Sequence, residues 1–213
     1  MSSIRTSELY PDRLVLASAS PRRRELLEKA GAGFSVLPSD ADEHADPSIP
    51  AAELVKLLSV RKAEATAALW NELPEDVLVL AADTVVEAPD GTILGKPADE
   101  ADAKSMLRAL SGTLHYVYSG FTLLWKGGIY TESVASGVRF RALTDVDIDG
   151  YIASGEPMGK AGSYAIQGLG GSFVEALEGD FTNVVGLPMP ALEDAILKLF
   201  GKKLSDFSAP ESV

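Results

Sequence analysis

The sequence contains no cysteine, only two histidines and no apolar run long enough to cross a membrane. Without cysteine the chain can form no disulfide, thiolate metal site or thiol nucleophile. His44 and His115 alone make a nitrogen-rich metal site a poor expectation. The apolar runs are shorter than the ~18 residues of a membrane helix, and the first residues lack the basic-then-apolar order of a signal peptide. We therefore expect a cytoplasmic protein.

Basic residues are also scarce, with 19 Lys and Arg against 31 Asp and Glu and a formal net charge of -12. Such an acidic surface repels nucleic acid and anionic membranes, so we expect neither as a partner. The 213 residues, 46% of them hydrophobic, are typical of a globular protein with a substantial core. We predict a flexible N-terminus over residues 1–12, a single domain over 13–201 and a flexible tail over 202–213.

Strand patterns and helix patterns are mixed along the chain, which predicts an α/β fold: a mixed twisted β-sheet with flanking helices, in two lobes around a central cleft. Strands are expected at Leu14–Ala17, Phe34–Leu37, Val77–Val86, Ile93-Leu94, Leu114–Trp125, Ile129–Arg141 and Phe173–Leu177, with one more after a turn at 178–180. Helices are expected at Pro21–Ala30, after Ser48-Ile49-Pro50, at Asp99–Leu110, after a capping box at Thr144 and Asp147, and after Pro188.

Three consecutive arginines, Arg22, Arg23 and Arg24, stand at the expected start of the first helix. Ser20 is a suitable N-cap residue, and Pro21 suits the first helical position. Cations at this end oppose the helix dipole, so an anion bound between them and the free backbone N–H groups would explain them. A solvated basic turn is the alternative.

Asp83 interrupts an otherwise apolar strand pattern. A buried carboxylate costs several kcal/mol unless it is paired or binds a metal. It is therefore either satisfied by backbone N–H groups or one lysine, or it serves as a metal ligand or general base. Lys96 and Lys160 lie in loops of small residues that leave room for a ligand. Together these residue types are typical of a phosphate site with an oxygen-ligated divalent cation, Mg or Mn.

Several ordered motifs resemble the Maf family of nucleoside triphosphate pyrophosphatases over nearly the whole chain. The matching blocks are Leu16-Ala17-Ser18-Ala19-Ser20-Pro21-Arg22-Arg23, Ala82-Asp83-Thr84-Val85-Val86, Gly95-Lys96-Pro97, Leu110-Ser111-Gly112 with His115, Lys160 through Gly168, and Gly179-Asp180 through Val185-Gly186-Leu187-Pro188. One departure is Gly159, where the family often has aspartate. The fold implied is the one shared with inosine triphosphate pyrophosphatases.

The resemblance implies hydrolysis of a nucleoside triphosphate between its α and β phosphates, with help from a divalent metal cation. By position, the expected catalytic residues are Asp83, Glu43, Lys62 and Lys96, with Glu43 and Asp83 also as metal ligands. Asp83 would activate water or hold the metal. The expected substrate-binding residues are Ser18, Ser20, Arg22, Arg23, Thr84, Lys160 and Gln167.

The chain is most similar to the branch of the family that acts on dTTP and UTP, in which Arg22, Thr84 and Gln167 match the specificity positions. A glutamine amide can donate to O4 of uracil or thymine and accept from its N3–H. Use of CTP or modified pyrimidine nucleotides remains open. The alternatives are a 7-methylguanosine triphosphate pyrophosphatase and a non-catalytic nucleotide-binding regulator of septum formation. The expected partner is a small-molecule nucleoside triphosphate, and a homodimer is left open.

Overall fold

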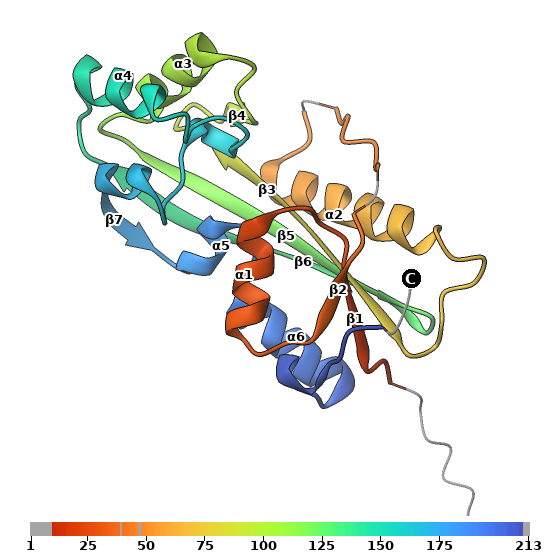
Figure 1. Cartoon of the computed structure of the whole chain (residues 1–213). Helices are drawn as coiled ribbons and strands as arrows, with labels where there is room; N and C mark the ends of the chain where they lie inside the picture. Colours follow the sequence, from red (N-terminus) through yellow and green to blue (C-terminus); the bar gives the residue numbers. More distant parts are fainter. Residues whose placement is uncertain (1–9, 39, 47, 211–213) are drawn as a thin grey trace, which may run out of the picture.

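The computed structural model describes residues 10–38, 40–46 and 48–210, which form a twisted seven-stranded sheet with helices on both faces (Figure 1). The strands are β1 (Arg13–Leu16), β2 (Phe34–Val36), β3 (Val77–Glu87), β4 (Ile93–Leu94), β5 (Leu114–Trp125), β6 (Gly128–Phe140) and β7 (Val174–Glu178). The helices are α1 (Pro21–Lys29), α2 (Ala51–Ala67), α3 (Glu100–Leu110), α4 (Asp145–Ala153), α5 (Phe181–Val185) and α6 (Met189–Phe200). The predicted α/β class with a mixed sheet and flanking helices is confirmed.

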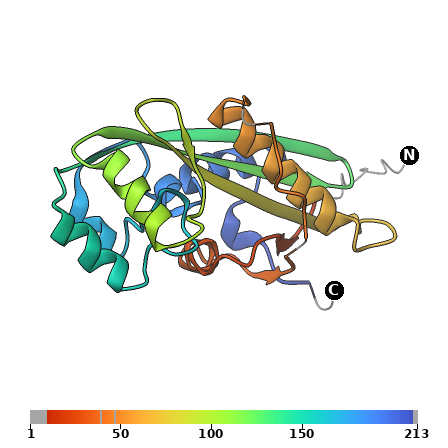
Figure 2. The same cartoon turned by 90° about the horizontal axis from the view of Figure 1, so that it is seen from above.

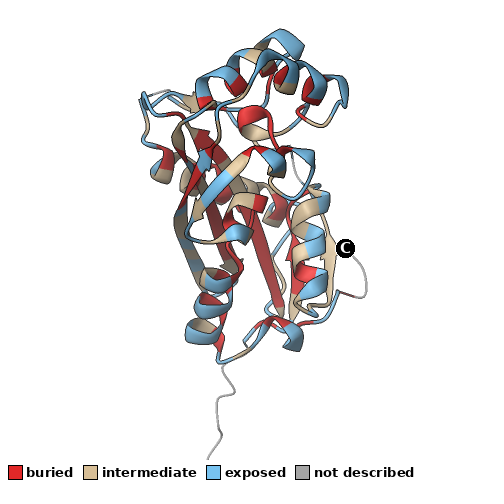
Figure 3. Cartoon of the chain, turned by 90° about the vertical axis from the view of Figure 1, so that its left-hand side faces the viewer, coloured by how far each residue is buried: buried red, intermediate tan, exposed pale blue. Residues whose placement is uncertain are grey.

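The sheet has the strand order β2-β1-β3-β5-β6-β7, and the short β4 pairs with β3. β1 runs parallel to β2 and β3, whereas all other pairs are antiparallel. The central strand β3 is apolar along most of its length because both of its faces are covered. Buried residues accordingly concentrate on the central strands (Figure 3).

The two faces of β3 meet different helices. Val79 and Ala81 belong to the cluster that includes Ala63 of α2, whereas Leu80 and Ala82 pack with α1 and α6. On this second face, another apolar cluster lies at the far end of the sheet under α3 and α4. The view from above shows α3 and α4 at one end of the molecule and α1 and α6 nearer its middle (Figure 2). Two packed regions therefore share one continuous sheet.

Local predictions had mixed outcomes at helix starts. The capping box of Thr144 and Asp147 is confirmed, with both reciprocal hydrogen bonds present. Ser20 occupies the predicted N-cap position of α1 with an extended backbone, but its hydroxyl makes no capping bond. The strand predicted after residues 178–180 is wrong. Asp180 caps the short helix α5 there by accepting from the Thr182 N–H at 2.7 Å.

The described part of the predicted C-terminal tail is packed against the domain, which corrects the expectation of a flexible segment there. Leu204 and Phe207 belong to the main apolar cluster. The Ser208 N–H donates to the Asp12 carbonyl, and its own carbonyl accepts from the Leu14 N–H, both at 2.9 Å. The limits of the domain at 13 and 201 stay a prediction, as does the part of each terminus outside the described residues. No helix of the described chain is long and apolar enough to cross a membrane.

Candidate active site

The candidate site lies beside a stretch of β3 that has a neighbour on one edge only. β1 pairs with β3 as far as Leu80, and β4 pairs with it from Val86 onward. In the described part of the chain, residues 81–85 pair with β5 alone. A cavity of about 630 Å³ occupies this gap. All eleven predicted site residues line it: Ser18, Ser20, Arg22, Arg23, Glu43, Lys62, Asp83, Thr84, Lys96, Lys160 and Gln167.

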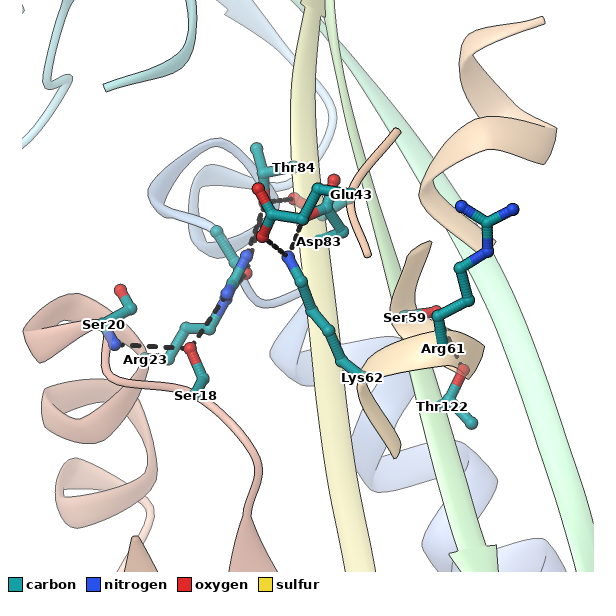
Figure 4. Close-up of polar contacts among 12 residues, drawn as sticks. Ser18, Ser20, Arg23, Glu43, Ser59, Arg61, Lys62, Asp83, Thr84 and Thr122 are labelled. Atoms are coloured by element: carbon teal, nitrogen blue, oxygen red, sulfur yellow. Dashed lines mark hydrogen bonds and ion pairs between the residues drawn. The ribbon is translucent and has the colours of Figure 1, made fainter. Parts of the chain in front are cut away.

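The open edge explains how side chains from both faces of the sheet reach one cavity. Asp83 and Thr84 are neighbours on β3 and point to opposite faces. Asp83 meets Lys62 of α2, whereas Thr84 meets Arg23 of α1 (Figure 4). A neighbouring strand on this edge would separate the two side chains.

Lys62 joins the two acidic residues of the site. Its Nζ lies 2.5 Å from Asp83 Oδ1 and 2.8 Å from Glu43 Oε1. The Lys62 and Asp83 side chains are only 14% and 13% exposed, whereas that of Glu43 is 53% exposed. The hydrogen bond from Lys62 lowers the pKa of Glu43 despite partial burial. Lys62 therefore pairs with the buried Asp83, as expected if the aspartate had only a structural role. The pair nevertheless lies in the wall of the cavity, where it can also contact a ligand.

The loop that carries Glu43 is anchored by the neighbour of Lys62. Arg61 donates from its Nη1 to the carbonyls of Asp42 at 3.2 Å and His44 at 2.5 Å. Consecutive residues of α2 thus hold the backbone on either side of Glu43 and its carboxylate. The sequence reasoning missed Arg61, because an arginine on a helix surface carries no signal of the loop it contacts.

A glycine in β5 allows α2 to approach the sheet closely. Gly120 pairs with Asp83, and a Cβ at position 120 would lie 2.6 Å from the carbonyl carbon and oxygen of Val55. One residue pair fixes the helix along the same strand: the Ser59 and Thr122 hydroxyls lie 2.8 Å apart and are fully buried (Figure 4). This close packing brings α2, and with it Lys62, to Asp83.

The three consecutive arginines have different surroundings. Arg23 donates to the Gly186 carbonyl at 2.8 Å, to Ser18 Oγ at 3.0 Å and to Thr84 Oγ1 at 3.3 Å. Within the described residues, Arg22 uses only its Nε, which donates to the Val185 carbonyl at 3.3 Å. Burial lowers the pKa of both guanidinium groups, which an arginine tolerates without losing its charge. Arg24 is exposed and does not line the cavity.

The network behind Arg23 contains buried polar residues that the sequence reasoning missed. Thr84 Oγ1 lies 2.7 Å from Ser119 Oγ, which donates to the Asn183 carbonyl at 2.8 Å. The Asn183 amide in turn donates to the Val117 carbonyl and to Ser136 Oγ, both at 3.0 Å. These bonds fix the backbone at Asn183. The carbonyls of Val185 and Gly186, which accept hydrogen bonds from the two arginines, follow it closely in the chain.

Two of the predicted ligand-binding side chains make no polar contact with the described part of the protein. Within the described residues, neither the Lys96 ammonium nor the Gln167 amide makes a hydrogen bond or ion pair, and both residues are exposed at the cavity. Lys160 instead donates to the Glu156 carbonyl at 2.5 Å, and burial lowers its pKa. Gly159 has a φ of +73° and open space around it, so glycine fits the loop here without strain.

The acidic pair is compatible with a divalent cation that arrives with a phosphate ligand. No group of three or more Asp, Glu or His side chains suited to a metal occurs in residues 10–38, 40–46 and 48–210. Mg²⁺, however, commonly binds through one or two carboxylates together with substrate phosphates and water. Glu43 and Asp83, held on one ammonium, supply that donor type. The metal stays a prediction.

Fold and cavity together define a mixed α/β protein whose cavity combines five cationic side chains with two carboxylates. The comparison with protein families agrees with this description: the family described as Maf-like protein matches residues 13–199. The match covers most of the chain, and the chain belongs to the Maf family.

Several similar proteins from different organisms share one name. The "dTTP/UTP pyrophosphatase" of Hahella chejuensis is 48% identical over 192 residues, which cover 90% of this chain and 94% of the relative. Proteins of that name from Pelotomaculum thermopropionicum and Clostridium novyi are each 45% identical, covering 88% and 89% of this chain and 96% of each relative.

Proposed function

We propose that this protein is a nucleoside triphosphate pyrophosphatase that hydrolyses dTTP and UTP to the monophosphate and pyrophosphate. The observation that carries the proposal is the cavity at the open edge of β3, which Arg22, Lys96 and Lys160 line together with Glu43 and Asp83. The name shared by relatives that are 45–48% identical over most of their length supports the same activity.

The cations bind the triphosphate in this proposal. Lys96 and the two Nη groups of Arg22 have no partner among the described residues, so they can bind phosphate oxygens without breaking existing contacts. Fixed cations stabilise the charge that develops on the phosphate and leaving-group oxygens during the reaction. Arg23, whose Nε, Nη1 and Nη2 each bind a protein oxygen, chiefly holds Ser18 and Thr84 in place.

The acidic pair activates the attacking water. Asp83 accepts the proton of that water, and Lys62 orients the carboxylate through Oδ1 while leaving Oδ2 for the reaction. A divalent cation, Mg or Mn, would be held by Glu43 and Asp83 and would neutralise phosphate charge when bound.

The base is recognised by Gln167 in this proposal. Its amide has no partner within the described chain, so it can donate to O4 and accept from N3–H of uracil or thymine. A site built for such a pair rejects bases that lack the matching groups, because its polar atoms would be left unpaired.

The decisive experiment incubates the protein with a nucleotide panel and Mg²⁺ or Mn²⁺ and separates pyrophosphate from orthophosphate. We expect pyrophosphate from UTP and dTTP. Asp83→Asn should lower turnover by at least ~10²-fold, the usual scale for loss of a general base, with folding retained. Asp194→Asn breaks an exposed 2.9 Å pair with Lys198 on α6 and is the matched control. Near-normal turnover in Asp83→Asn would remove this residue from the mechanism.

A further inference from the structure

A single carboxylate holds the loop that carries Gln167. Glu156 does not line the cavity. Both oxygens of its carboxylate nevertheless accept hydrogen bonds, one from α4 and two from the backbone that follows Gln167. Oε1 accepts from the Tyr151 hydroxyl at 2.7 Å and from the Gly170 N–H at 3.1 Å. Oε2 accepts from the Leu169 N–H at 3.0 Å. The carboxylate therefore fixes the backbone just after Gln167.

The backbone before Gln167 is hydrogen-bonded to Tyr151, which in turn binds Glu156. The Tyr151 hydroxyl, buried with its residue only 4% exposed, accepts from the Ala165 N–H at 3.1 Å. Because Tyr151 also donates to Glu156, residues 165 and 169–170 are anchored to one hydrogen-bonded unit. The Glu156 carbonyl additionally accepts from Lys160 at the start of this loop.

The loop passes so close to this carboxylate that its shape depends on it. A Cβ at Gly168 would lie 2.4 Å from Glu156 Oε2. Burial raises the pKa of Glu156, but hydrogen bonds from Gly170, Tyr151 and Leu169 outweigh this effect and lower it. The group is therefore a carboxylate at neutral pH, and charged acceptors form stronger hydrogen bonds than neutral ones.

We propose that Glu156 is a positioning residue that sets base selectivity by holding the backbone on both sides of Gln167. The inference rests on the proposed function. Since the Gln167 amide has no partner within the described residues, only its backbone fixes where it stands in the cavity. Loosening residues 165–170 would thus weaken recognition of the base while the residues around Asp83 keep their geometry.

The kinetic test compares Glu156→Gln with the unaltered protein. A glutamine keeps the shape but places an NH₂ group against one of the backbone donors. We expect KM for UTP to rise on the order of tenfold, as for the loss of one charged hydrogen bond, with kcat changed by less than about threefold on the same scale. The preference for UTP over GTP should fall by a similar factor. Tyr151→Phe should act in the same direction.

The control is Glu175→Gln, which removes the same charge from an exposed position on β7. It should leave KM, kcat and selectivity unchanged. A merely structural role of Glu156 would lower the amount of active protein, and hence kcat, without changing KM or the ratio of UTP to GTP. If both Glu156→Gln and Tyr151→Phe lowered kcat and left KM and the preference for UTP over GTP unchanged, the proposal would be overturned.

Hydrogen exchange gives a readout that needs no activity. In Glu156→Gln the amides of Leu169 and Gly170 should exchange faster, while those of β3 stay protected. Unchanged exchange would overturn the anchoring, and faster exchange with unchanged selectivity would overturn the role in recognition. If the unaltered protein hydrolysed no triphosphate, the proposed function would fail. Dissociation constants for a nonhydrolysable UTP analogue and for its GTP counterpart would then decide whether Glu156 sets selectivity.

Discussion

Replacing Gly120 by alanine tests whether the close packing of α2 sets the geometry of the Lys62–Asp83 pair. The new Cβ would lie 2.6 Å from the Val55 carbonyl and 2.9 Å from the Lys56 nitrogen, where ordinary contact begins at 3.4 Å. Because these neighbours are helix backbone, α2 must move away by about 0.8 Å, the difference between the first and last distances. We expect the free energy of unfolding to fall by about 1–3 kcal/mol, the usual cost of overpacking.

The same shift should also lower the catalytic rate of the molecules that remain folded. Lys62 would move relative to Asp83, and a misplacement of ~1 Å can lower the rate ~10²-fold. We therefore expect kcat for UTP to fall between about tenfold and a hundredfold, measured as pyrophosphate release from protein shown to be folded by urea unfolding. The change should appear in kcat rather than in KM, since the cations that hold the phosphates lie on other elements.

Gly150→Ala is the matched control. Gly150 lies within α4, where an added Cβ meets no atom within 4 Å, and alanine is the better helix former by ~1 kcal/mol. This variant should be as stable as the unaltered protein or more so, with the same kcat. Unchanged stability of Gly120→Ala would refute the steric argument. A destabilised Gly120→Ala with full turnover per folded molecule would refute the link between α2 and catalysis.

Three further substitutions test the remaining site and the core. Arg22→Ala should lower kcat/KM for every triphosphate, and unchanged kinetics would leave this arginine without a role in phosphate binding. Gln167→Glu should weaken use of UTP and dTTP more than that of GTP, whereas equal loss would show that it does not recognise the base. Burial lowers the pKa of His115 from 6.5 to about 4. Between these pH values the unfolded state binds more protons than the folded state, so the free energy of unfolding falls by up to ~3 kcal/mol as the pH drops from 6.5 to 4. His115→Gln should remove that dependence in urea unfolding at pH 4.5 and 7, and an identical pH profile would contradict it.

Most of the fold followed from local patterns. The run from Val77 to Val86 predicted a strand buried on both faces, and Thr144 with Asp147 predicted the start of α4. The segment after Asp180 was misread because its apolar residues also suit a strand, and aspartate as a helix cap was overlooked. The packing of Phe207 could not be read from its polar neighbourhood, since it depends on a cluster built by distant elements.

The site divides in the same way between local and distant signals. Asp83 stood out as an acid in an apolar strand, and the cations stood out in short loops at the ends of elements. Gly120 and Glu156 did not, because their roles depend on contacts with segments far away or across a loop. A glycine inside a strand pattern does indicate close approach of another backbone, so Gly120 carried a usable signal. Glu156, in a helix-end Gly-Glu-Pro sequence, carried none.

The contact of Ser208 with Asp12 and Leu14 has a consequence for how the chain is made. β1 has a neighbouring strand on each side, yet its first residues complete their backbone hydrogen bonds only with a segment nearly 200 residues later. A ribosome releases the N-terminal strand long before that segment, so this end of the sheet must wait for synthesis to finish. Contacts between such distant residues slow folding. We expect chains truncated before residue 204 to remain soluble only with help from a chaperone, because they also lose Leu204 and Phe207 from the main cluster.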